Sequence, residues 1–394
     1  MSKAKANKTY VVMVLMAALL LVCCAVPGII RPVSRHPSAT DPSSHTRVKM
    51  AWQTFAGKLT DLIFSPGAKF LACVDTKGAI CVYKSTGEKQ YTASVQGADK
   101  VVVSPDGKYA MAYSNLDLEN ATCTFLDNKG NTYWKLNVNG AVWSADVCNY
   151  DGNARFVIGT GTRRVYVVDI GMHKKYYRWW TAPGVVVSMY LEPDGESVVI
   201  GTWQDSSVER RDIRGRSIWS MNAGSACLPM IERFSSSDRL LVRYVPNNSS
   251  VDGSYEIIST MGKTIARGDI SVSDNQRVLF DPTCSYTCIS HTEVIKHKVK
   301  SMVEKRTVLQ TTSGARVWEK GSAFFQTDPI MVTAGGEVLL RDATNAVFMT
   351  NSDGALKQVT KLRAKPLRCA CSEDGSLCAL SCSDGSINLL KLSK

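Results

Sequence analysis

The residues best suited to chemistry in this 394-residue chain are its thirteen cysteines, its five histidines and its scattered carboxylates. No two cysteines form a Cys-x-x-Cys motif, and the histidines are too few to complete a zinc cluster with them. The chain also lacks a Gly-x-Ser-x-Gly elbow, a glycine-rich phosphate loop ahead of a helix and a His-Glu-x-x-His motif. We therefore expect a protein that is not an enzyme, with no catalytic residue, no metal ligand and no cofactor.

Eleven of the cysteines follow residue 50 and are spread over strand-like segments. Cys73 with Cys81, and Cys371 with Cys378, are spaced to face each other across hairpins. We expect most of these thiols to be small buried hydrophobic groups, because free cysteine is among the most buried residue types. In an oxidising compartment the two hairpin pairs are the first disulfides to expect, and the odd number leaves at least one thiol free within the chain.

Lysine and arginine gather in local clusters, some of them mixed with aromatic residues. The candidate partner contacts are Lys174, Lys175, Arg178, Lys296, Lys298, Lys300 and Arg306. Such a cluster is either a solvated strand face or a surface for an anionic partner, and the sequence leaves both open. Half of the formal net charge of +12 lies in residues 1–49, so the remainder is only mildly basic and we expect no nucleic-acid partner.

The elements that must position these residues repeat eight times, at intervals that average about 44 residues. Each repeat begins with a tight turn such as Ser104-Pro105-Asp106-Gly107, in which proline presets φ and glycine supplies a positive φ. A strand-sized apolar run follows most of these turns. A fixed period of this length, built from short strands, predicts an all-β propeller with four strands in each blade.

The second half of several repeats reads Asp-x-x-Gly-x-x-x-Trp, as in Asp127 to Trp134 and Asp212 to Trp219. We expect the glycine to form the hairpin between the third and fourth strands, and the indole ring to pack on a neighbouring blade. Gly171 is followed by an insertion before Trp179 and Trp180, either of which could fill that role, and we choose Trp179. The predicted docking residues are Trp52, Trp134, Trp179, Trp219 and Trp318.

This pattern resembles the tryptophan-docking motif of quinoprotein-like propellers, and the Ser-Pro-Asp-Gly turns resemble those of WD-repeat propellers. The resemblance covers roughly residues 50 to 394 and implies the fold much more strongly than a function. The Gly-His and Trp-Asp dipeptides of WD repeats are missing, and so is any ligand set for a quinone and calcium.

The two ends of the repeat region predict ring closure. The last repeat stops at a third strand, Ile387 to Leu392, whereas Val48 to Phe55 reads as an isolated fourth strand that carries Trp52. We expect this N-terminal strand to complete the last blade, which leaves no open sheet edge at the seam. Residues 48–394 then form an eight-bladed propeller, with seven blades if one weak repeat is misread.

Residues 1–47 differ in kind from the repeats. A basic segment, residues 1–9, precedes an uncharged apolar run, residues 10–30, that is long enough to span a bilayer; residues 31–47 read as a linker. We interpret the run as an uncleaved transmembrane signal anchor, with a cleaved signal peptide and a lipoprotein modified at Cys24 as alternatives. The preceding lysines favour a cytoplasmic N-terminus and a propeller outside the cytoplasm.

An anchor, a closed ring and no catalytic constellation together favour a scaffold for other envelope or membrane proteins in a cell-envelope assembly. In size and blade count the chain is similar to the envelope lipoprotein propeller of the outer-membrane β-barrel assembly machinery. The alternative is a sensor or enzyme whose ligand or cofactor binds in the central funnel. Polar groups converging on that funnel would favour the alternative, and an apolar funnel would count against it.

Overall fold

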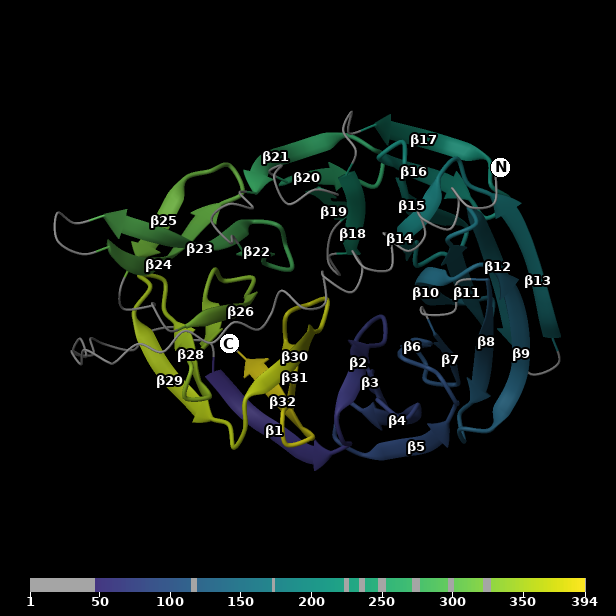
Figure 1. The fold of residues 1–394 in the computed structure, drawn as a ribbon, viewed down its shortest axis with the longest axis horizontal. Helices are drawn as coiled ribbons and strands as arrows, with labels where there is room; N and C mark the ends of the chain where they lie inside the picture. Colours follow the sequence, from purple (N-terminus) through teal and green to yellow (C-terminus); the bar gives the residue numbers. More distant parts are fainter. Residues whose placement is uncertain are drawn as a thin grey trace. The chain divides into compact units, whose positions relative to one another are not determined.

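The computed structural model describes residues 47–114, 119–171, 174–222, 227–233, 238–246, 253–270, 277–296, 301–321 and 327–393. These residues form 32 strands arranged as eight four-stranded antiparallel sheets. The prediction of an all-β, eight-bladed propeller is confirmed (Figure 1). The predicted N-terminal helix, residues 10–30, lies outside the described residues. From Arg47 onward the described segments contain no helix able to cross a membrane.

We number the blades in chain order and give their strands from the inner to the outer edge. Blades 1 to 4 are β2 (Leu59–Phe64), β3 (Phe70–Asp75), β4 (Ala79–Lys84), β5 (Lys89–Ser94); β6 (Lys100–Val103), β7 (Tyr109–Tyr113), β8 (Asn120–Asp127), β9 (Thr132–Asn139); β10 (Val142–Tyr150), β11 (Asn153–Thr160), β12 (Arg164–Gly171), β13 (Lys174–Thr181); and β14 (Val185–Leu191), β15 (Ser197–Trp203), β16 (Ser207–Asp212), β17 (Ser217–Asn222).

Blades 5 to 8 follow the same order, except that the outer strand of blade 8 comes from the start of the propeller. They are β18 (Cys227–Arg233), β19 (Arg239–Pro246), β20 (Gly253–Ser259), β21 (Thr264–Ile270); β22 (Arg277–Phe280), β23 (Tyr286–Lys296), β24 (Ser301–Thr311), β25 (Arg316–Lys320); β26 (Asp328–Val332), β27 (Val338–Arg341), β28 (Ala346–Thr350), β29 (Leu356–Lys361); and β30 (Pro366–Cys371), β31 (Leu377–Cys382), β32 (Ser386–Ser393), β1 (Arg47–Phe55).

The predicted closure of the ring is confirmed by the pairing of β1 with β32. The two strands are antiparallel, with Arg47 opposite Ser393 and Trp52 opposite Leu389. Figure 1 shows the purple β1 beside the yellow β32. Because the first described strand completes the last sheet, blade 8 has the same four strands as the others.

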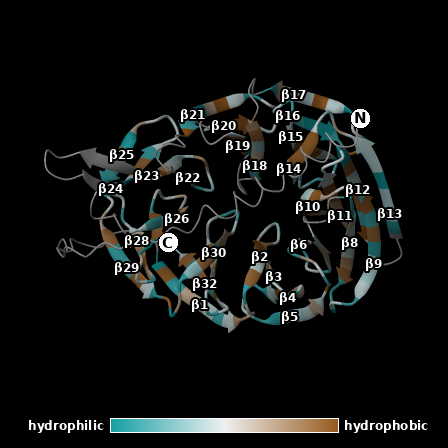
Figure 2. Ribbon diagram, in the orientation of Figure 1, coloured by the Kyte–Doolittle hydropathy of each residue, from teal (hydrophilic) through white to brown (hydrophobic). Residues whose placement is uncertain are grey.

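The hydrophobic core is divided among the interfaces between blades. The described residues form eight buried clusters, and each joins one blade to the next; the cluster around Leu389 and Leu71 joins blade 8 to blade 1. Inner strands such as β14 and β15 are mostly hydrophobic, whereas β13 is largely hydrophilic (Figure 2). A sheet buried on both faces needs continuous apolar runs, which explains why Val185 to Leu191 lacks polar alternation.

The tight turns of the sequence repeats connect the first strand of each blade to the second. In blade 2 the backbone N–H of Gly107 donates to the carbonyl of Ser104 at 2.9 Å, and the N–H of Tyr109 donates to Ser104 Oγ at 3.1 Å. Gly107 has φ +68°, and a Cβ there would lie 2.4 Å from the ring of Phe70 in blade 1. Glycine is therefore required both by the turn and by the close approach of the neighbouring blade.

Candidate interaction surfaces

Aromatic side chains on the outer strands of five blades lie against the hairpin glycine of the next blade. A Cβ built on Gly87, Gly262 or Gly354 would lie within 3.0 Å of Trp52, Trp219 or Trp318, respectively. The indole of Trp52 also donates to the carbonyl of Ser85 at 3.1 Å, and that of Trp219 donates to the carbonyl of Thr260 at 2.9 Å. Tyr91 occupies the same position against Gly130. These contacts hold blade to blade; Tyr91 and Trp318 are buried, whereas Trp52 and Trp219 are half-buried.

The choice of Trp179 as a docking residue is wrong, because the structure places Trp180 against the next blade. A Cβ on Gly215 of blade 4 would lie 2.7 Å from the ring of Trp180, whereas Trp179 is 48% exposed. The insertion after Gly171 lengthens the hairpin, and β12 then pairs with β13 without a bulge. Successive side chains of a strand point to opposite faces, so only one of the two indoles can face blade 4.

Trp134 packs differently from the other predicted docking residues. Its ring stacks on Phe125 of its own blade, with centroids 5.5 Å apart, and lies 6.1 Å from the ring of Tyr177 in blade 3. The glycine at the end of β12 in the next blade, Gly171, faces Asn153 instead of an indole. Trp134 therefore contacts the outer strand of blade 3 and not its hairpin.

Two of the basic clusters, residues 210–216 and residues 296–306, contain internal ion pairs. Arg306 lies 3.0 Å from Glu319, Arg210 lies 3.7 Å from Glu192, and Arg216 lies 2.6 Å from Asp212. Lys305 pairs with Asp328. A partner would have to compete with these internal carboxylates, so the predicted contact Arg306 has little charge to offer.

The cluster on β13 is not neutralised in this way. No carboxylate of the described residues lies within ion-pair distance of Lys175 or Arg178, and the same holds for Arg163 and Arg164 on the neighbouring turn and strand. Lys175 instead donates to the carbonyl of Tyr133 at 3.0 Å. Lys174 is described only by its backbone, which begins β13. We name the exposed residues of this strand, together with Arg163 and Arg164, the β13 surface.

Arg163 and Arg164 are candidate contacts that the sequence analysis missed. The guanidinium of Arg164 lies 4.3 Å above the ring of Trp179, and the N–H of Ala182 donates to the carbonyl of Arg163 at 2.7 Å. Both residues lie ten or more positions before Trp179 in the chain and join the cluster only through strand pairing. They could have been identified from the sequence only by predicting which residues of β12 lie opposite which residues of β13.

The second group of predicted contacts belongs to a hairpin that extends from blade 6. Strands β23 and β24 pair from Tyr286 with Thr311 to Lys296 with Ser301. In the described residues β22 pairs with β23 only as far as Ser290, and β25 pairs with β24 only from Thr307. The pairs from His291 with Arg306 to Lys296 with Ser301 thus form a two-stranded extension, which we name the blade 6 arm.

The structure does not describe all four predicted contacts of the arm to the same extent. Arg306 lies at the base of the arm, and Lys296 is described only by its backbone, at the end of β23. Lys298 and Lys300 lie outside the described residues.

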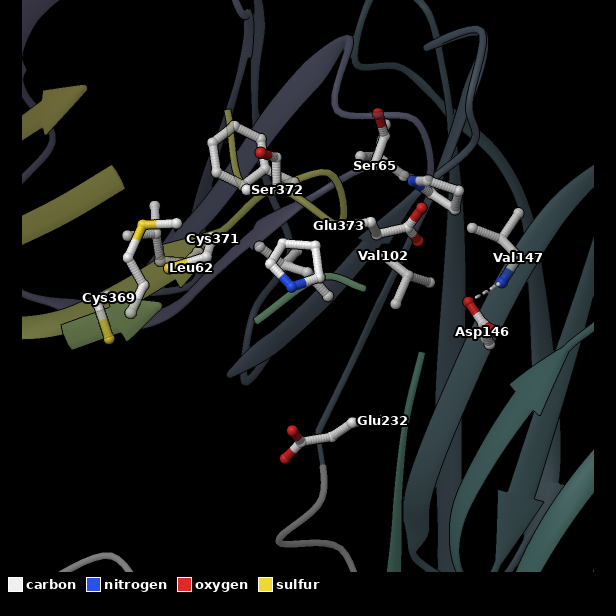
Figure 3. Close-up of a pocket in the computed structure, with 18 of the residues that line it drawn as sticks. Leu62, Ser65, Val102, Asp146, Val147, Glu232, Cys369, Cys371, Ser372 and Glu373 are labelled. Atoms are coloured by element: carbon white, nitrogen blue, oxygen red, sulfur yellow. Dashed lines mark hydrogen bonds between the residues drawn. The ribbon is translucent and has the colours of Figure 1, made fainter. Parts of the chain in front are cut away.

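The centre of the ring contains a cavity of about 640 Å³, lined by inner strands of seven blades. Most lining residues are apolar, such as Val102 and Met331, and none of them is a lysine, arginine or histidine. Figure 3 shows three carboxylates on its walls, Asp146, Glu232 and Glu373. Asp146 accepts hydrogen bonds from the backbone N–H groups of Leu191 at 2.7 Å and Val147 at 2.8 Å, so it serves the packing of blade 3 on blade 4.

The cavity offers few polar groups that could bind a ligand or a metal ion. Glu232 pairs with Arg243, and Glu373, the third wall carboxylate, also has an interaction partner. Among the described residues no group of His, Cys, Asp and Glu side chains is arranged to hold a metal ion. The mostly apolar wall with occupied carboxylates gives little support to a polar ligand in the funnel.

Two of the cysteines lie on the cavity wall. Cys369 and Cys371 are exposed on β30, where Figure 3 shows them close together. Cys371 Sγ lies 3.9 Å from Cys378 Sγ, and the hydrogen bond between the two thiols, together with complete burial, raises the pKa of Cys378 well above its ordinary value. The N–H of Ser372 donates to the carbonyl of Leu377, so these two residues are a hydrogen-bonded pair of the antiparallel ladder. Hydrogen-bonded and non-hydrogen-bonded pairs alternate, so the next pair, Cys371 with Cys378, is non-hydrogen-bonded. Side chains are closest in pairs of this kind.

The second predicted pair also faces across its hairpin, with Cys73 opposite Cys81. A hydrogen bond with the Cys73 thiol lowers the pKa of Cys81 to about 6. Eight of the eleven described cysteines are buried, in agreement with the expected role as small hydrophobic groups.

We expect mild oxidation with glutathione disulfide to join Cys371 to Cys378 as an intramolecular disulfide. Cys371 is the accessible thiol, and a non-hydrogen-bonded cross-strand pair has the short Cβ separation that a disulfide needs. Peptide mapping by mass spectrometry without reduction measures the bond. The matched control is Cys369→Ser, which should leave the bond intact, because Cys369 lies opposite Leu380. A linkage of Cys369 to Cys371 in its place would contradict the prediction.

Comparison with known proteins supports the fold. No family model matches the chain, and no curated protein matches it. Among solved structures it is similar to the Dos1 propeller, with 10% identity and a TM-score of 0.63 over 87% of this chain and 95% of that one. It is also similar to BamB from Moraxella catarrhalis (12% identity, TM-score 0.55, 87% and 97% covered) and to the β-propeller domain of Myceliophteria thermophila Cps50 (Swd1) (11%, 0.51, 88% and 100%). At these identities the likeness establishes a β-propeller and no particular activity.

Proposed function

We propose that this chain is a membrane-anchored scaffold whose propeller lies outside the cytoplasm and binds other envelope or membrane proteins. The proposal combines the apolar run at residues 10–30 with the surfaces of the described propeller. The similarity to BamB and to other propellers fits a platform of this kind.

The observation that carries the proposal is the blade 6 arm. An isolated two-stranded ribbon is marginally stable at best, so these residues add little to the stability of the ring. The arm nevertheless pairs apolar residues at two successive positions, Val294 with Val303 and Ile295 with Met302. A long projection that does not serve the core is typical of a binding element on a rigid scaffold.

The arm also has a firm base. Lys305 pairs with Asp328 of blade 7, and Arg306 pairs with Glu319 of β25. These ion pairs fix the direction in which the arm leaves the blade. A fixed direction lowers the entropy that a partner must overcome on binding.

Shortening the arm is expected to weaken partner capture without unfolding the propeller. Replacing Val294–Val303 by Asn-Gly leaves Glu293 opposite Glu304, a hydrogen-bonded pair that can close a two-residue hairpin, and keeps the base intact. We expect the melting temperature to change by less than about 4 °C, because a surface change of this kind is worth under about 1 kcal/mol. Capture of partner proteins should fall at least tenfold.

The measurement is affinity purification of the full chain from its own membranes, with quantitative mass spectrometry of the captured proteins. A matched variant keeps the arm at full length and replaces Val294, Ile295, Met302 and Val303 by threonine, which tests the apolar pairs separately from the arm's length. Equal capture by the shortened chain would remove the arm from the proposal. Absence of any stoichiometric partner of the full chain would remove the scaffold itself.

A further inference from the structure

Strand β13 has an unusually regular outer edge. The outer strands of the other seven blades each contain a register shift against their neighbour, as at Phe125/Leu126 for β9 and Arg210/Arg211 for β17. Such bulges twist an edge strand and discourage the addition of another strand. The register of β12 with β13 runs without a shift from Arg164 with Thr181 to Gly171 with Lys174.

The direction of the free backbone groups on this edge follows from the pairing. The N–H of Ala182 donates to the carbonyl of Arg163, which makes these two a hydrogen-bonded pair. In an antiparallel ladder hydrogen-bonded pairs alternate with non-hydrogen-bonded ones, so the intervening residues of β13 direct their N–H and C=O groups away from β12. These outward residues are Lys175, Tyr177, Trp179 and Thr181.

The side chains along this edge are large and exposed. Tyr176 is 49% exposed, Tyr177 is 45% exposed and Trp179 is 48% exposed. Aromatic residues that are half exposed in a row are unusual for a solvated face and typical of binding surfaces. Each offers apolar contact area at a low cost in side-chain entropy.

The charge of the β13 surface has one sign. The strand contains no aspartate or glutamate, and Lys175 and Arg178 have no carboxylate partner in the described part of the chain. The Nε and Nη2 groups of Arg178 are buried, so the accessible charge of the edge comes mainly from Lys175, with Arg163 and Arg164 beside it. This positive edge is complementary to carboxylates at alternate positions of an added strand.

We propose that the edge of β13 binds an extended acidic segment of a partner protein as a fifth strand of blade 3. The proposal rests on the scaffold function and names one of its binding sites. A polypeptide fits this edge better than a lipid headgroup does, because only another extended backbone matches a row of alternating N–H and C=O groups. The lysine, arginine and aromatic side chains then select acidic and apolar residues on the added strand.

Binding of a model peptide by the full chain in detergent tests this directly. The probe is a fluorescent peptide of about twelve residues that alternates glutamate and valine, long enough to pair with the eight residues of β13. Fluorescence anisotropy should show saturable binding of this peptide. A peptide with lysine in place of glutamate, and one with proline at every third position, should bind at least tenfold more weakly.

Variants of β13 separate backbone pairing from side-chain contact. Tyr177→Pro removes an outward N–H and leaves the bonds to β12 in place, so it should weaken peptide binding at least tenfold. Tyr177→Val loses the same ring but keeps the N–H, and should bind within about threefold of the unmodified chain. If Tyr177→Pro fails to fold, Thr181→Pro removes another outward N–H near the end of the strand.

Charge is tested by Lys175→Glu, which should weaken binding, against Lys135→Glu on the bulged outer strand β9, which should not. Unchanged peptide binding by a folded proline variant would overturn the proposal. So would equal binding of the lysine peptide, or binding to anionic phosphatidylglycerol vesicles with no binding of the peptide. If arm-dependent capture of partners persists while the peptide does not bind, the β13 proposal fails and the scaffold stands.

Discussion

A chain that lacks Arg47–Phe55 is expected to lose the cooperative unfolding of the propeller and to associate through blade 8. Strand β1 pairs with β32 along its length, so its removal exposes a row of unpaired backbone groups on β32. It also removes Trp52 from its position against Gly87 and opens the core cluster between blades 8 and 1. Differential scanning calorimetry and size-exclusion chromatography measure the two effects.

Two comparisons make this prediction specific to ring closure. Adding a peptide with the sequence of Arg47–Phe55 should restore part of the lost stability, because the missing strand is supplied from outside. Trp52→Ala should lower the free energy of unfolding by about 3–5 kcal/mol, whereas Trp179→Ala should cost less than about 1 kcal/mol, since only a contact with Arg164 is lost. A truncated chain that stays monomeric with an unchanged melting temperature would contradict the closure argument.

The propeller could be predicted from the sequence because its signals are local and repeated. The turn at Ser104 to Gly107 and the hairpin at Gly130 each need a positive φ within a few residues of a strand. Eight repeats of such signals leave few other folds open. Closure was predictable as well, because Trp52 lies on a strand that has no repeat of its own.

The candidate binding surfaces were less predictable because they depend on strand register and on neighbouring blades. The choice between Trp179 and Trp180 is decided by the absence of a bulge in β13. The residue types of the strand do not indicate whether a bulge is present. The availability of a cation is decided by acids elsewhere in the chain: Arg210 meets Glu192 of its own blade, whereas the exposed Lys175 meets no described carboxylate. Clusters of basic residues that look alike in sequence therefore differ in the charge they offer a partner.

Asp169→Ala is expected to cause the largest loss of stability of any single carboxylate substitution in blade 3. Asp169 accepts hydrogen bonds from Nε of Arg155 at 2.6 Å and from Nη2 at 2.9 Å. Nη1 of Arg155 donates to the carbonyl of Gly195 in blade 4 at 2.8 Å, and the guanidinium lies 3.5 Å above the ring of Tyr150. The arginine thus bridges two blades, and its charge depends on one carboxylate.

The expected size of the effect follows from the burial of this pair. Burial alone would lower the pKa of Arg155, but its hydrogen bonds to Asp169 and the charge of that residue raise it above the ordinary value, so the guanidinium stays charged. Only 4% of the Arg155 side chain is exposed, and removal of one partner from a buried pair typically costs about 3–5 kcal/mol. Urea denaturation measures this loss. The double variant Arg155→Met with Asp169→Val should lose less than Asp169→Ala alone, because it leaves no buried charge unpaired. A double variant less stable than the single one would show that hydrogen bonding to Gly195, and not the unpaired charge, dominates.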